Sequence, residues 1–141
     1  MPPSGTVSPA LSARIIHGSL VLGVVLFCLV SWFVAGRSAL PVSALPNRRV
    51  LYLGLFLVSV SLFGGAMFTV NRLRPPPPGA SQDDWWRTNL GKAVVVWALV
   101  EAPAILGTVA YLITRDFRTL LATFAGLLLF GSYRPSRLID R

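Results

Sequence analysis

The chain has 141 residues, of which 54% are hydrophobic and only 13% are charged. Soluble domains carry about 25% charged residues on average, so this composition excludes an ordinary water-soluble surface and indicates a protein of the lipid bilayer. Thirteen Lys and Arg against five Asp and Glu give a formal net charge of +8. These cations lie between apolar runs, where they mark membrane topology, and we expect no nucleic-acid partner.

Four apolar runs are each able to cross a membrane, because about 20 apolar residues in a helix span the hydrocarbon core. The runs cover residues 15–36, 50–71, 93–114 and 117–133. The last run is short and includes Arg118, whose long side chain can reach the interface. The sequence therefore predicts an all-α integral membrane bundle of four transmembrane helices, forming a single domain over 1–141.

The first run, 15–36, follows a tail rich in Pro and Ser, residues 1–12, which we expect to be disordered. Arg14 lies before the run like the positive start of a signal peptide. The run is much longer than the ~7–15 apolar residues of a signal peptide, so we expect a retained helix. It contains Cys28, the one cysteine of the chain, which excludes an internal disulfide.

The loop 72–81 contains four consecutive prolines, which favour an extended polyproline segment. Ser81 is suited to cap a helix, and acidic residues directly after it face the positive end of the helix dipole. We therefore predict a third helix over 82–114 that begins outside the membrane. Trp85 and Trp86 in its first turns are then expected to anchor the interface.

Only Arg115 and Asp116 separate the third run from the fourth, which predicts a tight antiparallel hairpin. Four spans place both termini and the long loop on one side, with eight cations there and five on the other side. Because positively charged loops remain in the cytoplasm, we expect both termini to be cytoplasmic. The expected location is a cell membrane, specifically a bacterial inner membrane, crossed by a multi-pass protein.

The two halves of the chain share short similarities. Residues 19–23 resemble residues 98–102, and residues 62–65 resemble residues 129–132. A duplication would give two parallel-repeat hairpins. Chance matching between apolar segments of limited composition is the alternative.

Glu101 is the ninth residue of the third apolar run and lies close to mid-bilayer. A charge at this depth costs about 2.5–3.5 kcal/mol, so the carboxyl is expected to be protonated or paired. Pro103 lacks an N–H and leaves the carbonyl of Leu99 without its helical partner. With Thr108, these groups are a candidate site for a proton or cation. A neutral carboxyl that bonds a neighbouring helix and sets its register is the alternative.

His17 lies about one turn inside the membrane, where a proton relay or a cofactor ligand is conceivable. A single histidine cannot supply both axial ligands of a haem within one chain, and we expect neither a cofactor nor a metal. The depths of His17 and Glu101 differ by about 9 Å at ~1.5 Å per residue, which argues against a direct pair. We interpret His17 as an interfacial residue with a hydrogen-bond partner.

Small residues four positions apart recur in three of the predicted helices. The pairs are Ser19 with Gly23, Ser61 with Gly65, and Ala122 with Gly126. Small residues allow helix backbones to approach closely in a bilayer. We expect these faces to pack against helices of this chain or of another chain.

The stretch 98–105 places Glu101 after Ala-Leu-Val and before Ala-Pro. This setting resembles the ion-binding helix of the rotary ATP synthase proteolipid, subunit c. The Gly64-Gly65 pair and the later Arg74-Pro75 are similar to the glycine-rich first helix and the polar loop of that family. The resemblance covers the second and third helices and implies an ion-carrying role for Glu101. The long Pro-rich loop and the two flanking helices differ from the family pattern.

The chain contains no phosphate-binding glycine loop, nucleophile elbow, metal-ligand spacing or paired carboxylates, and we expect no catalytic activity. The overall pattern resembles small four-helix bacterial membrane proteins. Two hypotheses remain. In the first, a non-catalytic membrane protein packs as a homo-oligomer or as an accessory subunit of a membrane complex. In the second, protons or cations cross the membrane through a site at Glu101.

Overall fold

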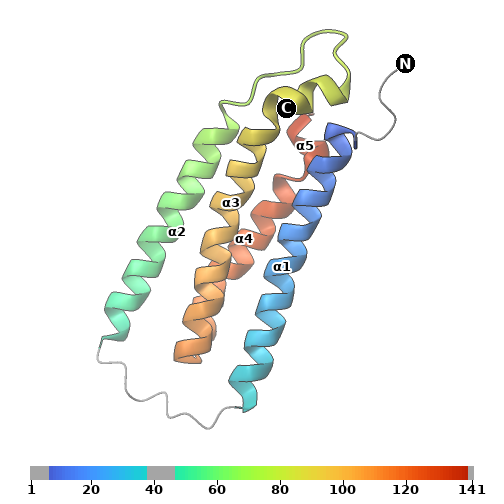
Figure 1. The fold of residues 1–141 in the computed structure, drawn as a ribbon. Coiled ribbons are helices and arrows are strands. Elements are labelled where there is room, and N and C mark those ends of the chain that lie inside the picture. Colours follow the sequence, from blue (N-terminus) through green and yellow to red (C-terminus); the bar gives the residue numbers. More distant parts are fainter. Residues whose placement is uncertain (1–6, 38–46, 140–141) are drawn as a thin grey trace.

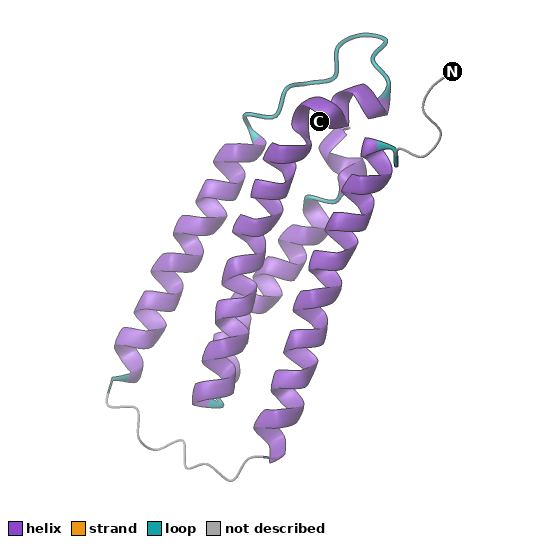
Figure 2. Cartoon of the chain, in the orientation of Figure 1, coloured by secondary structure: helices purple, strands orange, loops and turns teal. Residues whose placement is uncertain are grey.

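The computed structural model describes residues 7–37 and 47–139, and no strand occurs in this part of the chain. The elements are α1 (Pro9–Arg37), α2 (Arg48–Val70), α3 (Gln82–Thr114), the 3-10 helix η2 (Phe117–Thr119), α4 (Leu120–Ser132) and α5 (Pro135–Ile139). The long helices run side by side along one axis (Figures 1 and 2). The fold of the described residues is therefore all-α, as the apolar runs predict.

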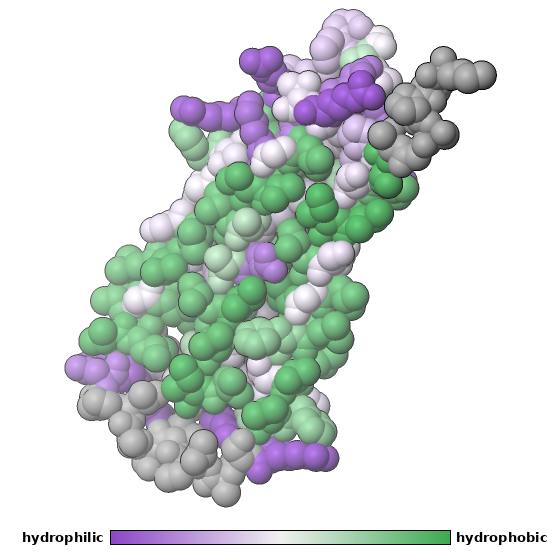
Figure 3. All heavy atoms as spheres, viewed as in Figure 1, coloured by the Kyte–Doolittle hydropathy of each residue, from purple (hydrophilic) through white to green (hydrophobic). Residues whose placement is uncertain are grey.

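Three helices, α1, α2 and α3, are long and apolar enough to cross a membrane. In the space-filling view, a broad apolar band separates hydrophilic ends (Figure 3). The expected fourth span is formed by η2 and α4 together, and this segment, Phe117–Ser132, is shorter than the other three. Sixteen residues extend about 24 Å at ~1.5 Å per residue, less than the ~30 Å core.

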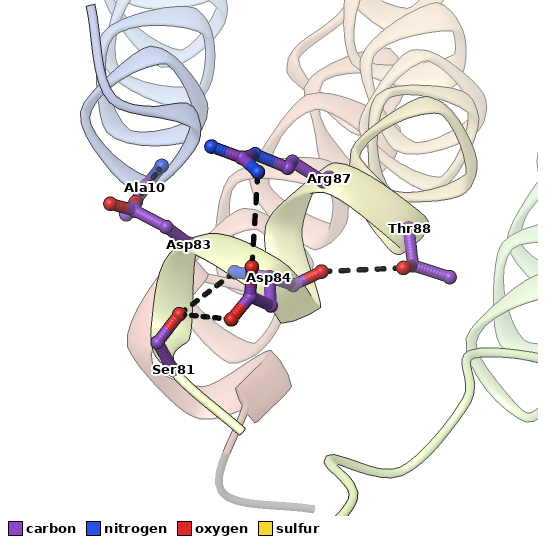
Figure 4. Close-up of polar contacts among 6 residues, drawn as sticks. All are labelled: Ala10, Ser81, Asp83, Asp84, Arg87 and Thr88. Atoms are coloured by element: carbon purple, nitrogen blue, oxygen red, sulfur yellow. Dashed lines mark hydrogen bonds and ion pairs between the residues drawn. The ribbon is translucent and has the colours of Figure 1, made fainter. Parts of the chain in front are cut away.

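The start of α1 corrects one sequence prediction, because residues 9–12 are helical rather than disordered. Pro9 suits a first helical position, where its missing N–H costs nothing. The Ser8 hydroxyl accepts from the backbone N–H of Leu11 at 3.2 Å. The carboxylate of Asp83 on α3 accepts from the N–H of Ala10 at 3.1 Å (Figure 4). Residues 1–6 lie outside the described part of the chain.

The N-terminus of α3 has the expected cap and begins at Gln82, the residue predicted from the sequence. The Ser81 hydroxyl accepts from the N–H of Asp84 at 3.2 Å and also donates to the Asp84 carboxylate at 2.6 Å. That carboxylate lies 3.9 Å from the guanidinium of Arg87 (Figure 4). The ion pair is exposed, so we assign it little stabilising energy.

Two tryptophans in the first turns of α3 are buried in the protein, which corrects the expectation that they anchor the interface. Trp85 is 3% exposed and Trp86 is 1% exposed. The indole N–H of Trp85 donates to the carbonyl of Arg74 at 2.7 Å, which fixes the start of the Pro-rich loop. Asn89 supports the same point by accepting from the Arg74 N–H at 3.1 Å. The two indole rings fill the end of the bundle, because hydrogen bonds between α3 and Arg74 hold the Pro-rich loop against them.

Helix α3 is the centre of the bundle, since it packs against α1, α2 and α4. Helices α1 and α2 lie on different sides of α3 and have little or no direct packing with each other. The α3–α4 pair is a tight hairpin, in which Arg115 takes the left-handed conformation at φ 57°. The two halves therefore differ in packing, and the described part of the chain is not a pair of equivalent hairpins.

Candidate functional site around Glu101

Glu101 lies near the middle of α3, one helical turn after Trp97 and on the same side of the helix. That side faces α1, because the rings of Trp97 and His17 of α1 are 5.2 Å apart. Glu101 is partly exposed, and its carboxyl makes no hydrogen bond or ion pair with any residue that the structure describes. An acidic group at mid-helix is thus left without an intramolecular partner.

The other three residues of the candidate ion site do not converge on Glu101. Leu99 precedes it by two positions, which places Leu99 about 200° round the helix. The methyl groups of Leu99 lie against Gly65 of α2, 3.6 Å from the position of a Cβ on that glycine. The carbonyl freed by Pro103 points along the same side as Leu99, away from the carboxyl. The structure therefore separates the carbonyl from the acid.

Thr108 serves the α3–α4 contact. Its hydroxyl donates to the carbonyl of Ala104 at 3.0 Å and lies 3.0 Å from the hydroxyl of Thr123 on α4. Thr123 also donates to the Ala104 carbonyl at 2.8 Å, and both threonines are fully buried. This polar network joins the two helices and was not recognised in the sequence, because its pairing depends on the register of the hairpin.

His17 has a hydrogen-bond partner, in line with its interpretation from the sequence. Its Nε2 lies 3.1 Å from the carbonyl oxygen of Phe130, near the end of α4. The last carbonyls of a helix lack intrahelical donors, so the imidazole N–H can cap this end. The indole N–H of Trp97 donates to the carbonyl of Tyr133, the residue that follows α4, at 2.8 Å. Side chains from α1 and α3 thus terminate α4 together.

The three pairs of small residues have different surroundings. Ser19 and Gly23 lie on the exposed face of α1, and a Cβ on Gly23 would meet nothing within 4 Å. Ser61 is also exposed, and its hydroxyl donates to the carbonyl of Leu57 at 2.8 Å. The first pair therefore contacts no helix of the described chain.

The pair on α4 lies where α4 approaches α3 closely. A Cβ on Gly126 would stand 2.8 Å from the Cβ of Ala104 and 3.0 Å from the carbonyl oxygen of Val100. Gly107 of α3 is equally constrained and faces Ala122, at 3.0 Å from its Cβ. Gly107 was missed in the sequence because the search was for small residues four positions apart. The residues four positions from Gly107 are Pro103 and Tyr111.

Asp116 connects the α3–η2 turn to α2. Its carboxylate accepts from the Tyr52 hydroxyl at 2.7 Å and from the backbone N–H of Arg118 at 2.9 Å. The hydrogen bond from Tyr52 lowers the pKa of the Asp116 carboxyl below its ordinary value of 3.8. The hydrogen bond from the Arg118 N–H lowers this pKa further. The ionised form is therefore favoured in the folded protein.

The depressed pKa of Asp116 predicts an acid-dependent loss of stability. The contribution is fully present above the unfolded-state pKa near 3.8, and it disappears as the pH falls through the lower folded-state pKa. We expect the stability advantage of the wild type over Asp116→Asn to shrink as the pH falls below about 5 and through the lowered folded-state pKa. Thermal unfolding in detergent, followed by circular dichroism, measures it. Tyr52→Phe is the control and should reduce the same pH dependence; a difference that grows in acid would contradict the assignment.

No group of three or more His, Cys, Asp or Glu side chains could hold a metal ion within residues 7–37 and 47–139. The described residues form an all-helical protein in which three helices are long and apolar enough to cross a bilayer. Comparison with known protein families, with curated proteins and with solved structures finds no match. The likeness of 98–105 to the proteolipid remains a prediction from the sequence.

Proposed function

We propose that this chain is a multi-pass integral membrane protein without catalytic activity, which packs as an oligomer or as an accessory subunit of a membrane complex. The observation that carries the proposal is the carboxyl of Glu101, which lies in mid-helix without a partner among the described residues. We propose that this carboxyl bonds a group from another subunit across the α1–α3 side of the bundle.

The energetics favour such a partner. An isolated charged side chain at the centre of a bilayer costs about 2.5–3.5 kcal/mol, and a protonated carboxyl still has a donor and an acceptor to satisfy. Interhelical hydrogen bonds within membranes contribute about 0.6 kcal/mol on average and ~1.7 kcal/mol at most. A contact between subunits would therefore recover part of the cost of placing Glu101 in the membrane.

The exposed face of α1 supports the same proposal. Ser19 and Gly23 follow His17 within two turns and have no large side chain to hold a neighbouring helix away. Because the His17 ring contacts Trp97, one turn before Glu101, these small residues lie at a similar depth to the carboxyl. A helix of another subunit can approach α1 closely there.

We further propose a bacterial inner membrane with both termini in the cytoplasm. The start of α1, the segment between α2 and α3, and α5 lie at one end of the bundle, and the α3–η2 turn lies at the other (Figure 1). Among the residues that the structure describes, the first end carries seven cations and the second carries five. The positive-inside rule then favours the first end as cytoplasmic.

Substitution of Glu101 tests the assembly. Glu101→Leu should weaken self-association or association with the partner subunit about 3- to 20-fold, because it removes one interhelical hydrogen bond. Glu101→Gln should assemble like the wild type, since an amide still donates and accepts. Subunit number is measured by single-molecule photobleaching in vesicles over a range of protein density. Assembly of Glu101→Leu at wild-type strength would overturn the proposal.

Proton or cation translocation at Glu101 is the second hypothesis raised by the sequence. It has less support, because Leu99 and Thr108 face α2 and α4 rather than the carboxyl. Translocation predicts that Glu101→Gln abolishes ion flux into vesicles and that a hydrophobic carbodiimide labels Glu101 with a rate that falls as pH rises. Flux in the wild type together with its loss in Glu101→Gln would replace the assembly proposal by this one.

A further inference from the structure

A groove of about 500 Å³ lies between α2 and the segment formed by η2 and α4. It exists because α2 and α4 both pack on α3 but scarcely touch each other. Sites for small molecules in proteins usually enclose about 300–1,000 Å³. The groove is thus large enough for one hydrocarbon chain, and it opens sideways between two apolar helices.

The lining of the groove is polar at one end and apolar along its length. Tyr52, Arg118 and Thr119 stand at the end near the α3–η2 turn. Further along, the walls are aliphatic and aromatic, up to Phe63 on α2 and Ala125 on α4. This distribution matches a ligand with a polar head and a hydrocarbon chain, oriented along the membrane normal.

One polar group inside the groove has no partner. Ser59 is 6% exposed, lines the groove, and its hydroxyl makes no hydrogen bond with any described residue. A serine within a helix commonly bonds the carbonyl four residues earlier, as Ser61 does with Leu57. A buried hydroxyl without a partner is costly. The described residues therefore leave the wall of the groove incomplete at Ser59.

The charges at the polar end favour a negative headgroup. The Asp116 carboxylate lies there, but it is engaged by the Tyr52 hydroxyl and by the backbone N–H of Arg118. Arg48 and the Arg118 side chain are both close enough to Asp116 to stabilise its charge. Two cations against one anion leave this end positive, and Arg118 lines the groove directly.

We propose that the groove binds one acyl chain of an anionic phospholipid, with the phosphate at Arg118 and the hydrocarbon chain along the wall that contains Ser59. The site is separate from Glu101, which faces α1 rather than α2 and α4. It gives the protein a specific lipid at the end of the bundle opposite to α5. The proposal stands independently of whether Glu101 mediates assembly.

The test measures lipid binding to the delipidated full-length protein by native mass spectrometry. Phosphatidylglycerol and phosphatidylcholine with identical chains are added separately, and inorganic phosphate is added in a third series. One equivalent of phosphatidylglycerol should bind more tightly than phosphatidylcholine by about five-fold, the effect of one cation near a headgroup. Phosphate alone should not compete, because the apolar groove supplies most of the affinity.

Two pairs of matched variants locate the site. Ser59→Leu fills the groove and should weaken binding of both lipids about ten-fold or more, whereas Ser61→Leu on the exposed side of α2 should bind like the wild type. Arg118→Gln is at an exposed position and should remove the preference for phosphatidylglycerol. Arg37→Gln, at the same end but packed over Phe33 at 3.9 Å, should preserve that preference.

Several outcomes would overturn the proposal. Equal lipid binding by Ser59→Leu and the wild type would show that the chain lies elsewhere. A changed subunit number in Ser59→Leu with unchanged lipid binding would assign the groove to a helix of another subunit. Loss of binding in Ser59→Leu supports the proposal only if Arg118→Gln also loses the preference for phosphatidylglycerol. The helical content of Arg118→Gln must equal that of the wild type, which excludes misfolding as the cause.

Discussion

Replacing Trp97 with alanine is expected to lower the free energy of unfolding by about 3–5 kcal/mol, the usual cost of truncating a buried large aromatic residue. Trp97 is 0% exposed and joins its own helix, α3, to α1 and to the end of α4. Its ring lies 5.2 Å from that of His17 on α1 and 6.1 Å from that of Trp86, and its N–H donates to the carbonyl of Tyr133. The substitution removes packing and a cap at the same time.

Trp32 provides the matched control, because it is 58% exposed on α1. Trp32→Ala should change the free energy of unfolding by no more than about 0.5 kcal/mol. Trp97→Phe keeps an aromatic ring but removes the donor to Tyr133, and its cost should be about 1–3 kcal/mol. Thermal or denaturant unfolding in detergent, followed by circular dichroism, measures all three. Equal losses for Trp32→Ala and Trp97→Ala would contradict the central position of Trp97.

The extents of α2 and α3 were predictable within about two residues because apolar length and capping chemistry are local properties. Ser81 correctly indicates the start of α3, and Arg115 with Asp116 correctly indicates the turn after it. The fourth apolar run was predicted as one helix, but the structure divides it into η2 and α4. The short α5 was missed, although Pro135 is typical of a first helical position.

The central position of α3 could not be predicted from hydropathy. In a bilayer, apolar residues face lipid as readily as protein, so an apolar helix does not reveal its buried side. The pairs Ser19/Gly23 and Ala122/Gly126 have the same spacing, yet one is exposed and the other contains the buried Gly126. Only the register of a partner helix distinguishes them, and that register is a property of the whole bundle.

In the candidate site, too, the features set by local sequence were predictable and those set by contacts between distant residues were not. Glu101 was identified because one acid within an apolar run is conspicuous. The separation of its carboxyl from the carbonyl of Leu99 was available from helix geometry, since two positions correspond to about 200°. The capping of α4 by His17 and Trp97 was not available, because it joins residues 113 and 36 positions apart in sequence.

Gly107→Ala is expected to destabilise the bundle by about 1–3 kcal/mol, the usual cost of overpacking a close contact. A Cβ at this position would lie 2.7 Å from the carbonyl oxygen of Thr119, 2.9 Å from the hydroxyl of Thr123 and 3.0 Å from the Cβ of Ala122. The nearest of these atoms belongs to the backbone and cannot move without displacing η2. The steric cost should therefore exceed the ~0.5–1 kcal/mol that alanine gains over glycine in a helix.

Gly91 on the same helix is the matched control, because a Cβ there would meet nothing within 4 Å. Gly91→Ala should stabilise the protein by up to about 1 kcal/mol, so the two identical substitutions should have opposite signs in the same unfolding measurement. Stabilisation by both would mean that η2 and α4 do not lie against Gly107. Since Thr119 and Ala122 also line the groove beside α2, that result would remove one wall of the proposed lipid site as well.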